Sequence, residues 1–122
     1  MADPHDLLSR ATAWKDNTHE LDKIMADMNT LSRTWPTIVG LIAQTLILKT
    51  PNRLNDYQSA KCHVHAARAF TMDDDALLHN IEEASKHLAN LREAWKPIAA
   101  LGIPGEHPRV TALAAGIEEL KR

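Results

Sequence analysis

Apolar residues recur along two long stretches of the chain at alternating spacings of four and three. The first repeat runs through Leu7, Ala11, Trp14, Thr18, Leu21, Met25, Met28, Ser32 and Trp35. Because residues three and four apart share one face of an α-helix, the repeat predicts a heptad-patterned helix over about residues 4–33. Asp3 and Pro4 suit the start of this helix, and Trp35-Pro36 predicts its end.

The second stretch has the same alternation. It runs through Leu77, Ile81, Ala84, Leu88, Leu91, Trp95 and Ile98. This pattern predicts a second long heptad-patterned helix over about residues 73–100. Acidic residues in its first turn favour the helix dipole, and Pro97 should bend or end it.

Shorter helices are predicted between and after these two. Residues 37–49 are apolar on almost every side, so this helix should be central or shared with another chain. Thr50-Pro51 predicts the start of a helix that reaches about Phe70, and Pro108 begins a short last helix. The sequence therefore predicts an all-α, compact bundle of four to five helices, forming one domain over residues 1–122. We expect the two long helices to form an antiparallel frame around the helix at 37–49.

Composition narrows the classes of protein. A chain of 122 residues with 44% hydrophobic and 25% charged residues is typical of one globular domain. The net charge of −2 argues against strong attraction to nucleic acid or anionic lipid. The apolar run Ile38–Leu48 is shorter than the ~20 residues that a membrane span needs. The acidic N-terminus does not resemble a signal peptide, and one cysteine forms no internal disulfide, so we expect a cytoplasmic protein.

Motifs of familiar enzymes are missing from the sequence. It contains no glycine-rich nucleotide loop, no G-x-S-x-G, no H-E-x-x-H and no C-x-x-C. The E-x-x-H motif of di-iron bundles is missing as well. These observations favour a protein that is not an enzyme.

Histidines suggest one candidate site. His79, Glu83 and His87 are spaced by four, so they lie on one side of the predicted helix. Imidazole and carboxylate groups bind zinc or another divalent metal, with His19 or Cys62 as candidates for a further ligand. The simpler interpretation is a solvated polar face without a metal.

A second group of candidates lies in the segment Cys62-His63-Val64-His65. Cys62 and His65 are three apart and can share a helix face, whereas His63 points toward the apolar side and is predicted to be a core histidine with a hydrogen-bond partner. Lys61, His65 and Arg68, extended by Arg53, form a small basic stripe. Such a stripe is the candidate contact for nucleic acid.

The apolar helix at 37–49 suggests the leading hypothesis. If four amphipathic helices do not cover it, an apolar surface remains, formed by Trp35, Ile38, Ile42, Ile47 and Leu48. We therefore predict a non-catalytic helical interaction protein that self-associates or binds a protein partner as an adaptor, small subunit, regulator or inhibitor. The alternatives are a histidine-rich bundle that responds to metal or pH, and a small subunit of a nucleic-acid complex.

Overall fold

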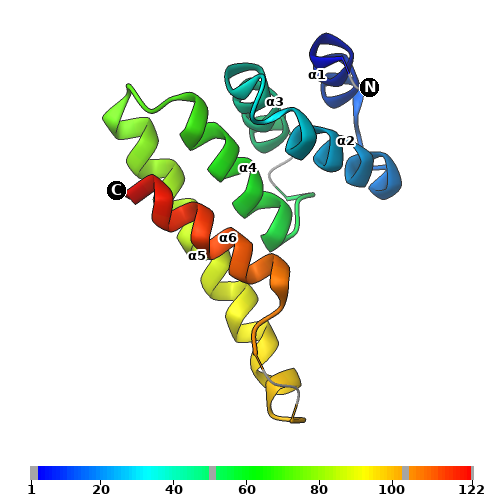
Figure 1. The fold of residues 1–122 in the computed structure, drawn as a ribbon. Coiled ribbons are helices and arrows are strands. Elements are labelled where there is room, and N and C mark those ends of the chain that lie inside the picture. Colours follow the sequence, from blue (N-terminus) through cyan, green and yellow to red (C-terminus); the bar gives the residue numbers. More distant parts are fainter. Residues whose placement is uncertain (1–2, 50–51, 103–104, 122) are drawn as a thin grey trace.

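The computed structural model describes residues 3–49, 52–102 and 105–121, and all regular secondary structure within them is α-helical. The helices, in chain order, are α1 (Pro4–Ala13), α2 (Thr18–Leu31), α3 (Pro36–Lys49), α4 (Asp56–Ala69), α5 (Asp74–Ala99) and α6 (Pro108–Lys121) (Figure 1). The predicted all-α bundle is confirmed, although these ranges hold six helices rather than four or five. No helix in the described ranges is both long and apolar enough to cross a membrane.

Helix α4 lies at the centre of the bundle. It packs on α3 and also on α5 and α6, while α1 and α2 pack on α3 (Figure 1). One hydrophobic cluster comes from α1, α2 and α3 with Cys62 of α4, and another from α4, α5 and α6. The expected frame of two long helices around residues 37–49 is therefore wrong, because α4 rather than α3 is the helix that both clusters share.

The expected helix over 4–33 is divided into α1 and α2. Trp14 ends α1 in an extended conformation (φ −62°, ψ 139°), and its indole N–H donates to the Asn17 carbonyl oxygen at 2.7 Å. The Asn17 side chain then accepts from the Glu20 N–H and caps α2. These local hydrogen bonds satisfy backbone and side-chain groups at the turn between α1 and α2. The heptad spacing of apolar residues continues unchanged across this turn, so the pattern did not reveal it.

Arg10 connects the two short helices. Its guanidinium is 3.1 Å from a Glu20 carboxylate oxygen and 2.7 Å from an Asp27 carboxylate oxygen. The hydrogen bond to Asp27 raises the pKa of Arg10 above its ordinary value. One arginine at the end of α1 thus contacts two carboxylates of α2, which favours the folded-back arrangement of the pair.

Helix α4 begins at Asp56, later than the sequence suggested. Asn55 and Gln58 form a reciprocal capping box, in which each side chain accepts from the other residue's backbone N–H. The expected start at Thr50-Pro51 lies outside the described residues. The predicted bounds of α5 are confirmed to within one residue at each end, and Pro97 lies inside its last turn.

The end of α5 is attached to the segment before α6. The indole N–H of Trp95 donates to the Gly105 carbonyl oxygen at 2.9 Å, and Arg92 contacts Glu106 at 2.6 Å. Ile98 is exposed in this last part of α5. The last position of the second heptad repeat therefore lies on the surface and not in the core.

Gly40 is the point of closest approach between α3 and α4. A Cβ added at Gly40 would lie 3.2 Å from the His65 carbonyl oxygen and would overlap the Cβ of Ala69. Both are attached directly to the α4 backbone, so neither can turn away. Gly116 of α6 is also helical and buried, but a Cβ there would be 3.5 Å from the Arg68 Nη2 atom, the far end of a flexible side chain.

We expect Gly40→Ala and Gly116→Ala to change stability in opposite directions. Gly40→Ala overpacks the α3–α4 contact and should lower the free energy of unfolding by about 1–3 kcal/mol. Gly116→Ala adds helix propensity without a clash and should raise it by up to about 1 kcal/mol. Urea unfolding of both variants measures the two values. Equal effects of the two substitutions would contradict the close approach at Gly40.

His65 is a polar residue inside the bundle. It is 1% exposed, and within the described part of the chain neither ring nitrogen has a hydrogen-bond partner. Burial, with smaller contributions from Lys61 and Arg68, lowers the pKa of His65 to about 3. The ring is therefore neutral at pH 7, and its unpartnered nitrogens reduce stability by about 1–3 kcal/mol.

We expect His65→Leu to raise the free energy of unfolding at pH 7 by about 1 kcal/mol. It replaces an unpartnered buried polar ring with an apolar side chain of similar size. The advantage should grow as the pH falls toward 5. In the unfolded chain His65 binds a proton below its ordinary pKa, but in the folded protein only near pH 3. Falling pH therefore favours unfolding of the natural chain, by on the order of 1–2 kcal/mol at pH 5.

Urea denaturation of both chains at pH 7 and pH 5 tests this expectation. The other histidines are present in both chains, so the difference between them isolates His65. A variant that is less stable than the natural chain at both pH values would mean that the ring has a polar partner.

Candidate metal centre

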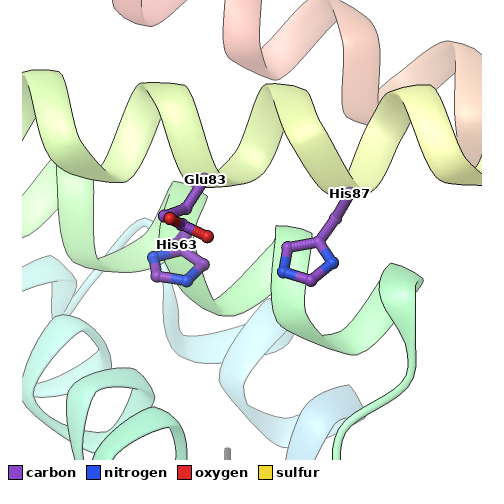
Figure 2. A group of neighbouring side chains, drawn as sticks. All are labelled: His63, Glu83 and His87. Carbon is purple, nitrogen blue, oxygen red and sulfur yellow. The ribbon is translucent and has the colours of Figure 1, made fainter.

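A cavity of about 260 Å³ lies between α4, α5 and the residues at the end of α3. It is lined by Ile47, Leu54, Ser59, His63, His79, Glu83 and His87. Figure 2 shows His63 on α4 and Glu83 and His87 on α5, with all three side chains turned into the space between the two helices. The cavity thus brings together three imidazoles and one carboxylate.

His63, Glu83 and His87 each offer one ligand atom, and these atoms lie within 4.8 Å of one another. Ligands held about 2 Å from a tetrahedral zinc ion are about 3.3 Å apart. Small side-chain rotations would therefore bring these atoms to metal-binding distance. His63 is buried, and Glu83 and His87 are partly buried.

His87 is oriented by a carboxylate of the neighbouring helix. Its Nδ1 atom lies 2.8 Å from Oδ1 of Asp56, which also accepts from the Asn90 amide at 3.2 Å. The hydrogen bond with His87 holds the pKa of Asp56 below its ordinary value, so this carboxylate is ionised and only accepts. The proton on a neutral His87 ring therefore resides on Nδ1, which leaves Nε2 as the free ligand atom.

The His63 ring is also oriented by a hydrogen-bond partner on the neighbouring helix, in this case an amide. Its Nδ1 atom lies 2.8 Å from the side-chain oxygen of Asn80, which is itself buried. Burial lowers the pKa of His63, so the ring is neutral at pH 7. A proton on Nδ1 donates to the Asn80 oxygen, and Nε2 is again unprotonated. Both histidines thus have the arrangement seen at metal sites, where an outer oxygen orients the ring of a ligating histidine.

The predicted set of His79, Glu83 and His87 is only partly present: the structure joins Glu83 and His87 with His63 and leaves His79 beside them. His79 and His87 are eight residues apart, which is about 12 Å along a helix. Two imidazoles this far apart on one helix could both reach an ion only if the ion lay on the straight line between them. The backbone of the intervening turns occupies that line. His63, on the facing helix, has no such restriction.

His63 was correctly predicted as a core histidine with a hydrogen-bond partner, but its place beside Glu83 was missed. A signal was present in the sequence, since Asn80, Glu83 and His87 recur at spacings of three and four on one face of α5. Asp56 and His63 are likewise seven apart on α4. Neither spacing tells which turn of α4 faces which turn of α5. Of the suggested further ligands, His19 is exposed on α2 and Cys62 is not in the cluster.

Cys62 is fully buried beside Met25, with 3.9 Å between the two sulfur atoms. Burial raises the pKa of the Cys62 thiol to about 12. A thiol in this environment is protonated at pH 7 and unreactive.

The predicted basic stripe is not a continuous surface. Lys61 is half-buried and donates to Asn29 at 3.2 Å, while His65 is in the core. Arg68 is 3.9 Å from Glu119, and Arg53 is 3.7 Å from Asp16. Lys61, Arg68 and Arg53 thus contact three different parts of the chain, and two of them pair with carboxylates, so they do not form one row of free cations.

The predicted apolar surface is divided in a similar way. Ile42 is fully buried and belongs to the core, and Ile38 and Ile47 are partly buried against it. Trp35 and Leu48 are exposed, at 46% and 80%. Leu41, which the sequence analysis did not single out, is 43% exposed. The exposed apolar residues of this region are therefore Trp35, Leu41 and Leu48.

Comparison with known proteins adds no family to this picture. No family model matches the chain, and neither a curated protein nor a solved structure shows significant similarity to it.

Proposed function

We propose that this protein binds a divalent transition metal, zinc in the first place, through His63, Glu83 and His87. The observation that carries the proposal is the pairing of each imidazole with an outer oxygen. Asp56 and Asn80 each hold an Nδ1 atom at 2.8 Å. On each neutral ring the proton then lies on Nδ1, and Nε2 is the nitrogen that remains for a metal ion.

The donor set favours zinc over the lighter divalent ions. Calcium and magnesium prefer sites made entirely of oxygen, whereas imidazole nitrogen suits zinc, cobalt, nickel and copper. A pair of neutral imidazoles and one carboxylate is also a known set of protein ligands for zinc. Because His63 lies on α4 and the other two ligands on α5, a bound ion would join the two helices and stabilise the fold.

We expect zinc to raise the melting temperature of the metal-free protein. A ligand present at 100 times its dissociation constant adds about 2.7 kcal/mol of stability. For a chain of this size, that corresponds to roughly 10 °C. Glu83→Gln and His87→Ala should abolish most of the shift, because each removes a ligand from a partly exposed position. His19→Ala removes an exposed histidine elsewhere and serves as the matched control.

Asp56→Asn tests the outer partner separately. It keeps a polar side chain at the start of α4 but removes the charge that orients His87. We expect zinc affinity to fall about 10–100-fold, as measured by calorimetric titration. The proposal fails if the natural chain shows no thermal shift, or if His19→Ala and His87→Ala weaken binding equally.

The exposed apolar residues of α3 favour a second candidate function, an interaction with another protein or another copy of the chain. Leu41 and Leu48 are seven residues apart, so they lie on the same side of α3. Trp35 immediately precedes Pro36, the first residue of the same helix. Exposed apolar side chains that share one side of a helix, as Leu41 and Leu48 do, are typical of association sites.

Light scattering after size-exclusion chromatography tests self-association. We expect the natural chain to show a mass that increases with concentration, and Leu41→Glu with Leu48→Glu to be a monomer at every concentration. Met72→Glu changes an apolar residue that is 97% exposed outside this surface and is the control. A natural chain that stays monomeric throughout contradicts self-association.

A further inference from the structure

We infer that a metal ion in this site keeps one coordination position open toward the cavity and binds a small carboxylate there. The inference rests on the proposed metal-binding function. It goes further in assigning the site to the open class, which exchanges ligands, rather than to the closed structural class.

The first argument is the number of ligands. Zinc in proteins takes four ligands, and sites with three protein ligands hold water or another exchangeable ligand at the fourth position. Within the described ranges, His63, Glu83 and His87 form the one group of three or more His, Cys, Asp or Glu residues whose ligand atoms all lie within 4.8 Å of one another. Three protein ligands leave one position to be filled from solvent.

The second argument concerns His79, which also lines the cavity. Its ring centroid lies 6.0 Å from that of His63, close enough to suggest a fourth ligand. However, the span of about 12 Å along α5 prevents His79 and His87 from ligating one ion together on a straight helix. His87 is the one held by Asp56, so His79 is left as a neighbour of the open position.

Among the described residues, the remaining walls of the cavity supply no competing ligand. Ile47 and Leu54 have only apolar side chains, and Ser59 carries a neutral hydroxyl. The usual protein ligands of zinc are cysteine thiolates, histidine nitrogens and the carboxylate oxygens of Asp and Glu, so a neutral hydroxyl is not among them. The cavity volume of about 260 Å³ is larger than the space that an ion and one water molecule need, since a water molecule occupies about 30 Å³. A ligand of a few heavy atoms therefore fits.

Charge and hydrogen bonding favour a carboxylate. Among the groups bound directly to the metal, a divalent ion and one carboxylate, Glu83, carry a net charge of one, which a monoanion would neutralise. The ionised Asp56 lies on the other side of the His87 ring and is not one of these groups. One carboxylate oxygen can bind the metal while the other accepts from the Ser59 hydroxyl at the cavity wall. Ile47 and Leu54 then contact a short apolar tail.

Cobalt(II) substitution tests this inference on the full chain, since cobalt reports its coordination in the visible spectrum. We expect added acetate to change the spectrum of the cobalt-loaded protein in a saturable way. His79→Ala should leave cobalt affinity unchanged to within about twofold, in contrast to the loss of at least about tenfold for His87→Ala. Ser59→Ala should weaken acetate binding without weakening cobalt binding.

The outcomes separate this inference from the proposed function. If cobalt binds but acetate leaves its spectrum unchanged, the site is closed and the inference is overturned while metal binding stands. If His79→Ala weakens cobalt binding tenfold or more, His79 is a ligand, and the inference is again overturned. If the natural chain shows no visible cobalt spectrum, the proposed metal-binding function itself fails.

Discussion

Helix α4 is enclosed by other helices on opposite sides, and this burial depends on small side chains at the points of contact. Gly40 lets α3 approach Ala69 and the His65 carbonyl more closely than a methyl group would allow. Within α4 itself, the buried alanines Ala60, Ala66 and Ala67 are equally small. Since the distance between packed helices follows the side chains at the contact, one helix can serve two hydrophobic clusters at once.

A helix that is buried on two sides carries its polar residues into the interior. His63 and His65 are two positions apart on α4, so their side chains point in widely different directions. His63 faces α5 and contacts the Asn80 oxygen, whereas the His65 nitrogens have no hydrogen-bond partner among the residues that the structure describes. Burial lowers the pKa of both rings, and only the neighbouring side chains distinguish a candidate ligand from a neutral core residue.

The contact between α4 and α5 therefore sets both the fold and the candidate site. Asp56 is the first residue of α4, and its carboxylate accepts from His87 and Asn90 of α5. Asn80 of α5 reaches back to His63 of α4. These polar contacts cross the helix pair in both directions around Glu83. A shift of one helix along the other by a single turn, about 5.4 Å, would separate every one of these pairs.

By itself, the sequence determined the elements that depend on neighbouring residues. Pro36 begins α3, acidic residues near Asp73 begin α5, and the apolar spacing marks the helical segments. It also placed Glu83 and His87 on one side of a helix. Each of these features follows from a periodicity of 3.6 residues, which is a local property of the chain.

Only the tertiary structure decided which helix is central, which residues of the apolar segment are covered, and which histidine joins Glu83 and His87. The turn at Trp14 was also hidden, because a break of a few residues left the heptad spacing intact. The physical reason is that the alignment of one helix against another depends on side-chain shapes distant in sequence, such as Gly40 against Ala69. Periodicity fixes the faces of each helix but not the turn at which two faces meet.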